Sequence, residues 1–305
     1  MPLEYVSRLL SMAKKSGRTH GLAVAAAGEQ VCLEAVVVAE EEGLVRPGLY
    51  GDRAEIERIL AGLGREAKDY RIENAATAEE AAHQACASLA SGENGILMKG
   101  LVQTGDLLHV YFDKGYGLRG ERPMSHVGLF EVPGFERLFT LTDAAMNVAP
   151  DEERLFVITR NAVEFLHFLG WERPRVALLA ATSGVYKRQP ATGTARRVAE
   201  RAAREIPDIE IVGPLALDEA LSPAAAATKG VGGAIRGNAD LIVVPSLECG
   251  NVIYKALTSL AHAKVVGACL GGKAPIVMTS RADTEETKLL SMALACCMAD
   301  GSGIE

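Results

Sequence analysis

The strongest constraint on the fold of this chain is a series of short, continuously apolar runs. Each is bounded by glycine, proline or a charged residue, and most are followed by a helical pattern. Unbroken apolar runs are typical of strands covered on both faces. Strands that alternate with helices predict an α/β fold with a largely parallel sheet flanked by helices. The runs lie at 21–27, 45–51, 93–100, 175–181, 208–214, 239–245, 263–270 and 274–280.

Helices are expected between these runs. The patterns predict one helix near 29–42 and another over 78–90. A third follows Asp52, whose short acidic side chain is a plausible N-cap. The segment 125–143, "SHVGLFEVPGFERLFTLTD", breaks the rhythm, because two strand-like stretches flank a Pro-Gly turn. It predicts a β-hairpin rather than a helical crossover.

The length of 305 residues exceeds the usual size of one domain, which favours two domains that share a cleft. A junction is expected just beyond the hairpin, near 147–153, where Pro150 and three acids open a new helix. A crossing back near 271–274 would let the last strand and helix complete the first domain. We therefore expect a discontinuous first domain, 1–148 plus 275–305, and a second domain, 149–274.

Charge and hydropathy exclude several classes of partner. The chain has 32 basic and 39 acidic residues, a net charge of −7, and no Lys/Arg block longer than a pair, which argues against nucleic-acid binding. The charged opening lacks the apolar core of a signal peptide, and no apolar run is long enough to span a membrane. A soluble, cytoplasmic protein without a membrane partner is expected. An anionic substrate would need a local cationic pocket.

The cysteines indicate neither a disulfide framework nor a zinc site. They are scattered in apolar segments without CxxC spacing, as expected of reduced, buried thiols in a cytosolic protein. No metal site is expected. The six are Cys32, Cys86, Cys249, Cys269, Cys296 and Cys297.

The first candidate site is the pair Ser280-Arg281 in "PIVMTSRADTEETK", where a strand gives way to a helix. A helix N-terminus presents unpaired N–H groups and a partial positive charge, and ligands of α/β sheets collect at the carboxyl ends of strands. Arginine adds a permanent cation for phosphate or thiolate, and serine adds an adjustable hydrogen bond. Asp283 and Glu286 have capping-box spacing for a helix starting near Thr284. A helix cap beside a solvated arginine explains the dipeptide equally well.

The second candidate is "VPSLECGNVIYKAL", 244–257, again a strand, a small-residue loop and a helix. Gly250 permits a close backbone approach. Asn251, Tyr254 and Lys255, at i, i+3 and i+4, share one helix face. Their amide, phenol and ammonium suit a phosphorylated ligand. An amphipathic helix with ordinary surface polar residues is the alternative.

Other polar residues stand at similar turns. A lone histidine such as His126 is more often a core or surface residue than a catalyst, and Asp143 and Asn147 suit helix or turn caps as well as substrate contacts. The additional candidates are Thr104 at a strand-to-helix turn, Arg119 before the hairpin, Ser125 and His126 where its first strand begins, and Asp143 and Asn147 after its second strand.

Several blocks, taken in order, resemble the phosphate acetyltransferase/phosphate butyryltransferase family. They are "YGLR", "SHVGLFEVPG", "TDAAMNVAP", "GPLALDEALS", "GNADLIVVPSLECGNVIYK" and "PIVMTSRADTEETK". The resemblance runs from about Gly21 to Ala299 and is densest after Tyr116. "SHVGLFEVP", "GPLALDEA" and "TSRAD" look closer to the butyryltransferase branch. Several blocks in the right order are far more specific than any one of them.

The resemblance implies a reversible reaction in which acyl-CoA and phosphate give acyl phosphate and CoA, without a metal or organic cofactor. It also implies a two-domain α/β/α sandwich similar to isocitrate and isopropylmalate dehydrogenases. The site is expected in the cleft between the domains, and the protein is expected to be a homodimer. Its partners would be acyl-CoA and inorganic phosphate, with a butyryl or another short-chain acyl group.

The resemblance also assigns residues. It places Ser280 and Arg281 at the reacting centre, and the residues matching Asn251, Tyr254 and Lys255 in the same cleft. Ser125 is expected near the phosphate. We further expect Thr104 and His126 among the phosphate or acyl contacts, and Arg119, Asp143 and Asn147 as possible substrate contacts.

One position departs from the family. The acetyltransferase branch carries an aspartate seven residues after the reacting-centre serine, proposed as a base for the CoA thiol, whereas this chain has Thr287. Threonine cannot act as a carboxylate base. Asp283 and Glu286 are near in sequence, but a side chain one position along a helix points elsewhere. The identity of the base stays open.

Three other functions are compatible with parts of the pattern. A phosphate acetyltransferase would differ only in acyl group. A dehydrogenase on the same fold would need clustered acids or histidines for a divalent metal, whereas the six histidines are spread along the chain. A non-catalytic CoA-binding relative would bind CoA without phosphate-dependent breakdown of acyl-CoA.

Overall fold

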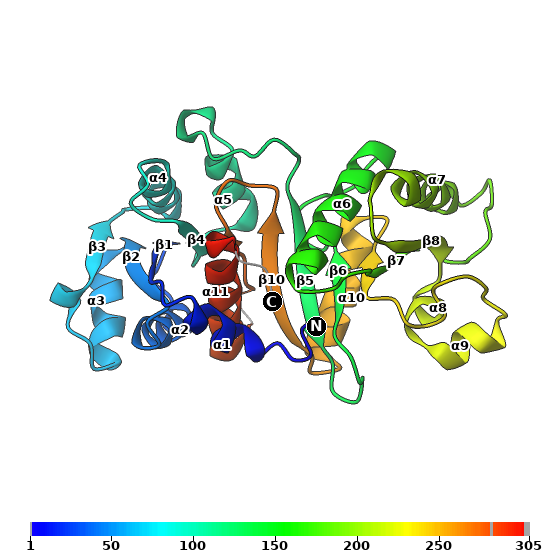
Figure 1. The fold of residues 1–305 in the computed structure, drawn as a ribbon. Coiled ribbons are helices and arrows are strands. Elements are labelled where there is room, and N and C mark those ends of the chain that lie inside the picture. Colours follow the sequence, from blue (N-terminus) through cyan, green and yellow to red (C-terminus); the bar gives the residue numbers. More distant parts are fainter. Residues whose placement is uncertain (1, 281–282, 302–305) are drawn as a thin grey trace. The chain divides into compact units, whose positions relative to one another are not determined.

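The computed structural model describes residues 2–280 and 283–301, and these form two compact units (Figure 1). We call residues 7–121, 266–280 and 283–301 the N-terminal unit, and residues 2–6 and 122–265 the central unit. The units begin and end at other residues than the predicted domains 1–148 with 275–305 and 149–274. The hairpin belongs to the central unit because its second strand pairs with a later strand of that unit. The predicted domain cleft stays a prediction.

The N-terminal unit contains a mostly parallel sheet in the order β3-β2-β1-β4-β11-β10. The neighbouring strands within this unit pair in parallel, except that β10 and β11 are antiparallel. Its strands are β1 (His20–Ala25), β2 (Val45–Gly51), β3 (Arg71–Asn74), β4 (Ile96–Lys99), β10 (Lys264–Leu270, the unit beginning at Val266) and β11 (Ile276–Val277).

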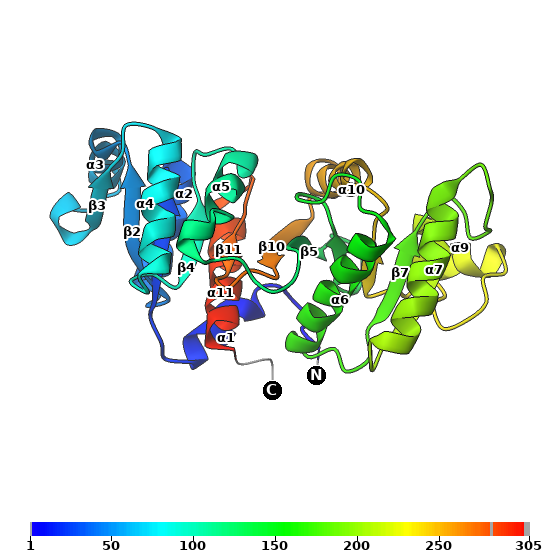
Figure 2. The same cartoon turned by 90° about the horizontal axis from the view of Figure 1, so that it is seen from above.

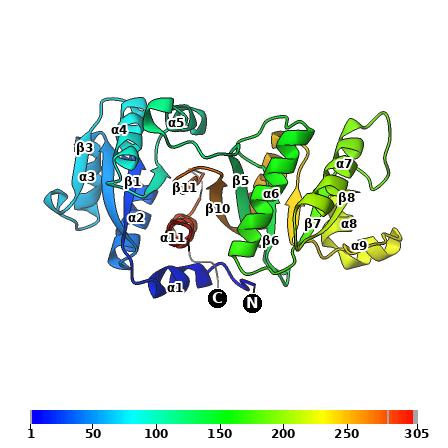
Figure 3. The same cartoon turned by 45° about the horizontal axis from the view of Figure 1, so that its top comes forward.

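Helices cover both faces of this sheet. Figure 3 shows α4 and α5 on one face and α2 and α11 on the other, with α1 packed on α11. The helices are α1 (Arg8–Lys15), α2 (Gln30–Glu41), α3 (Arg53–Gly62), α4 (Ala78–Ala90), α5 (Thr104–Tyr111) and α11 (Glu285–Asp300), with short 3-10 turns η1 (Ala67–Asp69) and η2 (Lys114–Tyr116). The unit is therefore an α/β/α sandwich.

The strands of the central unit follow the order β5-β6-β9-β7-β8. The hairpin strands β5 and β6 are antiparallel, as predicted, and the remaining pairs are parallel. The strands are β5 (Ser125–Glu131), β6 (Phe139–Thr142), β7 (Arg175–Leu179), β8 (Glu210–Leu215) and β9 (Leu241–Val243). The helices are α6 (Glu152–Phe168), α7 (Pro190–Glu205), α8 (Leu217–Leu221), α9 (Pro223–Thr228) and α10 (Leu247–Ser259).

Side chains that alternate along the central strands build two separate cores. Val176 and Leu241 pack with α6 and α7, whereas Ala177 and Ile242 pack on the other face, with residues of α8 and α10. Figure 2 shows α6 and α7 on one side of the sheet and α10 on the other. Because successive strand residues point to opposite faces, an unbroken apolar run supplies both cores.

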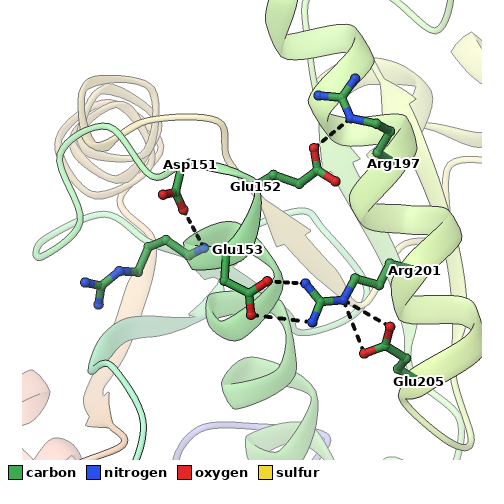
Figure 4. Close-up of polar contacts among 7 residues, drawn as sticks. Asp151, Glu152, Glu153, Arg197, Arg201 and Glu205 are labelled. Atoms are coloured by element: carbon green, nitrogen blue, oxygen red, sulfur yellow. Dashed lines mark hydrogen bonds and ion pairs between the residues drawn. The ribbon is translucent and has the colours of Figure 1, made fainter.

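Ion pairs join the start of α6 to α7 (Figure 4). Arg197 Nε lies 2.6 Å from a Glu152 carboxylate oxygen, and Arg201 pairs with Glu153. The Arg201 guanidinium also lies 3.8 Å from the Phe156 ring centroid, within cation–π range. The acids suit the positive end of the α6 dipole. Water and salt screen such surface pairs, so the apolar contacts beneath dominate the stability of this helix pair.

The predicted helices are largely confirmed. α4 spans the expected 78–90, and the Asp52 carboxylate caps α3 by accepting the N–H groups of Ala54 and Glu55. The capping box predicted for the last helix is wrong. Thr284 is the N-cap of α11, and its hydroxyl accepts the N–H of Thr287 at 3.2 Å. Asp283 instead accepts the backbone N–H of Ser280.

The cysteines are in the environment that the sequence predicts, as reduced and mostly buried thiols. All six cysteines are free thiols; five are buried and Cys249 is partly buried. Burial raises the pKa of the Cys86 and Cys296 thiols to about 12. Within the described residues, no helix is both long and apolar enough to cross a membrane.

Gly250 allows α10 to approach the turn after β6, and its replacement by alanine tests this contact. An alanine Cβ would lie 2.5 Å from the Asp143 carbonyl oxygen and 3.0 Å from the Ala144 Cα. Because backbone atoms cannot move aside cheaply, we expect Gly250→Ala to lower the free energy of unfolding by about 1–3 kcal/mol. Urea denaturation measures the change.

The matched control is Gly62→Ala, at a helical glycine whose added Cβ would meet nothing within 4 Å. It should leave stability unchanged or raise it by up to about 1 kcal/mol. Equal effects of the two substitutions would contradict the proposed close approach at Gly250.

Candidate active site

Asp143 organises the turn that follows β6. Its side chain is 3% exposed. One carboxylate oxygen accepts the N–H groups of Ala145 and Met146, both at 2.9 Å. The other accepts the N–H of His126 at 3.0 Å and the side-chain amide of Asn147 at 2.6 Å. The carboxylate therefore caps a turn, the structural alternative considered for Asp143 and Asn147.

Ser125 and His126 begin the neighbouring strand β5 and are both buried. The Ser125 hydroxyl oxygen accepts a hydrogen bond from Asn161 Nδ2 at 3.1 Å, and the same amide donates to the Pro123 carbonyl at 3.0 Å. The His126 and Tyr254 ring centroids lie 6.3 Å apart. Asn161, on α6, was not identified from the sequence, because one asparagine in an apolar helix gives no motif.

The predicted polar face of α10 divides into a buried and an exposed part. Tyr254 is 9% exposed and packs edge-on against Phe130, with ring centroids 5.3 Å apart. Asn251 and Lys255 are exposed. Lys255 Nζ lies 5.4 Å from the Tyr254 ring centroid, and Asn251 Nδ2 donates to the Ala144 carbonyl at 3.4 Å.

These contacts join the predicted residues of the central unit into one cluster, which we call the central cluster. Asp143 connects strand β5 to the turn, and Asn251 connects the turn to α10. The cluster consists of Ser125, His126, Asp143, Asn147, Asn251, Tyr254 and Lys255.

A second group of candidates lies in the N-terminal unit, where β4 and β11 end side by side. These strands are parallel neighbours, with Leu97 opposite Ile276 and Met98 opposite Val277. Their carboxyl ends therefore meet at one edge of the sheet. The turn after β4 leads to Thr104, the first residue of α5, and the segment after β11 leads to Ser280.

The backbone of Ser280 is held from both sides. Its N–H donates to an Asp283 carboxylate oxygen at 2.6 Å, and its carbonyl accepts the Asp283 N–H at 3.1 Å. The ammonium of Lys288 donates to the carbonyls of Ser280 and Asp283, at 3.0 and 3.2 Å. Arg281 lies outside the described residues.

Lys288 was missed as a site residue, although its sequence position held a signal. It stands three, four and seven residues before Ser291, Met292 and Ala295, all buried on α11. Helical spacing therefore puts a lysine on the core face. In the structure Lys288 is 1% exposed.

Among the residues that the structure describes at this edge, the buried charged side chains are both lysines. Lys99, at the end of β4, is 7% exposed, and its ammonium donates to the Gly100 carbonyl at 3.2 Å. Lys99 and Lys288 both act to lower the pKa of the Cys32 thiol, although burial outweighs them and raises that pKa to about 12. The two ammonium groups thus place positive charge beneath the turns that lead to Thr104 and Ser280.

Two other residues have local structural roles. Thr287 lies in the first turn of α11, at the position where the acetyltransferase branch carries an aspartate. Its hydroxyl oxygen accepts a hydrogen bond from the Thr284 hydroxyl at 3.2 Å. Arg119 is exposed, and its Nε donates to the Phe112 carbonyl at 2.5 Å. Within 2–280 and 283–301, no three histidine, cysteine, aspartate or glutamate residues are grouped so that they could hold a metal ion.

Comparison with known proteins identifies the family. The model described as "Phosphate acetyl/butaryl transferase" matches residues 64–296. A phosphate butyryltransferase from Clostridium acetobutylicum is 39% identical over 94% of this chain and 96% of its own length. The chain belongs to this family. A phosphate acetyltransferase from Thermotoga maritima is 38% identical, over 97% of this chain and 100% of its own length.

Solved structures agree with this membership. A branched-chain phosphotransacylase from Enterococcus faecalis has a TM-score of 0.79 and 31% identity, over 92% of this chain and 99% of its own. A 4-hydroxythreonine-4-phosphate dehydrogenase from Klebsiella pneumoniae has a TM-score of 0.52 and 13% identity, over 92% of this chain and 100% of its own. At that identity, the second similarity shows the fold alone.

Asp143→Asn tests whether the carboxylate holds the turn. The asparagine amide would offer one acceptor oxygen, and its NH₂ group would face donors, so we expect the free energy of unfolding to fall by about 2–3 kcal/mol. Urea denaturation measures it. The control is Asp151→Asn, at the N-cap of α6, where asparagine caps as well and the change should stay within about 0.5 kcal/mol. Unchanged stability of Asp143→Asn would show that the turn does not need this charge.

Proposed function

We propose that the chain catalyses reversible transfer of a short acyl group between CoA and inorganic phosphate. The observation that carries the proposal is the similarity, over nearly the whole chain, to proteins named phosphate butyryltransferase and phosphate acetyltransferase. The segments "SHVGLFEVP", "GPLALDEA" and "TSRAD" favour butyryl or another short chain over acetyl. Overall identity, 39% against 38%, does not separate the two substrates.

The chemistry requires one bond to form and one to break. A phosphate oxygen attacks the thioester carbonyl carbon, and the C–S bond then breaks to release the CoA thiolate. Phosphate near neutral pH includes much dianion and needs little help to attack. In the reverse direction the CoA thiol, with a pKa of about 8.5 if ordinary, must ionise before it attacks. We propose direct transfer in a ternary complex without an acyl-enzyme.

Within this reaction, Ser280 and Arg281 are the proposed catalytic residues. The Arg281 guanidinium would stabilise the thiolate and the negative charge that develops on the carbonyl oxygen, and Ser280 would donate a hydrogen bond to sulfur or oxygen. The buried ammonium groups of Lys99 and Lys288 favour negative charge at the same edge. Thr287 supplies no carboxylate, so the proposal assigns thiol ionisation to the positive charge.

The central cluster supplies the remaining proposed contacts. Asn251 and Lys255 are exposed, and their amide and ammonium suit phosphate or acyl oxygens. Ser125, His126 and Tyr254 are buried, so contact with substrate requires the residues that cover them to move. Thr104 and Arg119 are proposed contacts from the N-terminal unit. Orientation of the two substrates would supply much of the acceleration.

Three further expectations accompany this function. We propose that the two units are the domains of an isocitrate/isopropylmalate dehydrogenase-like fold, which the dehydrogenase similarity supports. We propose a homodimer, for which sedimentation equilibrium is the test, and a cytoplasmic location. We also propose that no metal or organic cofactor is needed. Loss of activity after EDTA treatment, restored by added metal, would contradict that last proposal.

A panel of acetyl-, propionyl-, butyryl- and isobutyryl-CoA tests the activity. We expect CoA release that depends on phosphate, fastest with a four-carbon acyl group. The controls omit phosphate or enzyme. No release with any thioester would overturn the acyltransferase proposal, and fastest release with acetyl-CoA would reassign the substrate to acetyl. CoA binding without turnover would indicate a non-catalytic relative.

Arg281→Ala tests the proposed charge stabilisation. We expect kcat to fall by at least about a hundredfold, because the thiolate loses its cation. Steady-state kinetics with the best thioester measures it, and Arg58→Ala, at an exposed arginine paired with Glu55 on α3, is the control. A kcat within about threefold of wild type, roughly 0.6 kcal/mol of barrier, would remove Arg281 from the mechanism.

A further inference from the structure

Lys288 occupies a position that is unfavourable for a charged side chain. It is the fourth residue of α11 and is 1% exposed. A buried ammonium loses its hydration, which is unfavourable unless other polar groups replace the lost water. It also lies at the helix N-terminus, where the dipole favours negative rather than positive charge. Among the described residues, no carboxylate forms an ion pair with it.

The contacts of Lys288 explain what the charge does. Helical side chains point back towards the N-terminus of their helix, and the Lys288 side chain accordingly reaches the segment before α11. Its ammonium donates to the carbonyls of Ser280 and Asp283, at 3.0 and 3.2 Å. Asp283 in turn accepts the Ser280 N–H at 2.6 Å. Both backbone polar groups of Ser280 are thus held by charged side chains.

An apolar residue would fill this part of the core at lower electrostatic cost. The neighbouring buried residues of α11 are mostly alanine, leucine and methionine, so the surroundings suit such a side chain. The substitution Lys288→Met would remove the donor that binds the Ser280 and Asp283 carbonyls. The position of Ser280 would then no longer be fixed by this contact. Charge-assisted hydrogen bonds are roughly twice as strong as neutral ones, and Lys288 donates one to the Ser280 carbonyl and one to the Asp283 carbonyl.

We propose that Lys288 is a positioning residue, which fixes the backbone of Ser280 so that its hydroxyl is oriented for acyl transfer. The inference rests on the proposed function of Ser280. Lys288 itself touches no reacting atom in this role. Misplacement of a reacting group by about 1 Å can cost a hundredfold in rate, so loss of this contact acts on the chemical step.

The experiment compares Lys288→Met with Ser291→Ala, a matched control on the same helix. Ser291 is also 1% exposed, but its hydroxyl oxygen accepts the N–H of Gly267 at 3.4 Å instead of binding the described residues Ser280 or Asp283. We expect Lys288→Met to lower kcat by roughly ten- to a hundredfold, with both KM values within about twofold of wild type. Ser291→Ala should keep the wild-type kcat. Circular dichroism checks that both variants are folded.

A double-mutant cycle with Ser280→Ala separates positioning from a general structural effect. If Lys288 acts through Ser280, Lys288→Met should lower the kcat of Ser280→Ala by less than about twofold. The same factor in both backgrounds would overturn the proposal, as would a wild-type kcat for Lys288→Met. If wild type and Ser291→Ala release CoA normally, such a result rejects the role of Lys288 alone. An inactive wild type rejects the proposed function.

Lys288→Arg keeps the test decisive if the methionine variant does not fold. Arginine retains the cation but places its N–H donors differently, so kcat should be lowered with KM retained. Amide hydrogen exchange, read on the peptide spanning Ser280 to Lys288, should be faster than in wild type. Unchanged kcat and unchanged exchange would overturn the proposal.

Discussion

The burial of the mostly parallel strands of each unit on both faces is the constraint on which the rest of the structure depends. A strand covered on both sides cannot carry an unpaired polar group along its length, so polar side chains collect where strands end. In the N-terminal unit, Lys99 and Ser280 lie at or just after the carboxyl ends of the adjacent parallel strands β4 and β11. In the central unit the strand ends deliver Asp143 from β6 and, through α10, Asn251. The candidate residues are therefore placed by strand register rather than by flexible loops.

The two groups of candidate residues satisfy buried charge in opposite ways. In the central unit, the buried carboxylate of Asp143 gathers backbone and side-chain N–H groups, and buried Asp240 pairs with Arg175 at 2.8 Å. At the carboxyl edge of the N-terminal sheet, the buried charges are ammonium groups that gather backbone carbonyls. A carboxylate surrounded by donors fixes a turn. An ammonium surrounded by carbonyls fixes a turn and also leaves a positive field, which suits phosphate, thiolate and acyl phosphate.

Periodicity and turn chemistry were sufficient to predict most helices and strands, because each apolar run supplies two cores at once. Edge strand β3 was missed because only Ile72 of its four residues is buried, so it has no apolar run. Two predicted strands, at 239–245 and 274–280, form shorter ladders, Leu241–Val243 and Ile276–Val277, because their carboxyl ends become the turns that carry candidate residues. Helical spacing in the sequence places Tyr254 and Lys255 on one helix face. It does not show that Phe130 packs against the tyrosine ring, which is a tertiary contact. Helical spacing places Lys288 on the core face of α11, but no local pattern encodes its carbonyl partners or the contact of Asn161 with Ser125, which are tertiary.

The discontinuous N-terminal unit has a consequence for how the protein is made. Strand β11 pairs with β4, and α11 packs against α1 and α2, yet both elements come from residues 276–300, far along the sequence from their partners. During synthesis the early strands therefore stay partly uncovered on the face where α11 packs, until the chain has been made as far as residue 300. A truncated product keeps that apolar surface exposed and is a target for chaperones or proteases. The segment that carries Ser280 arrives with the same strand, so an incomplete chain that lacks a finished core also lacks this serine.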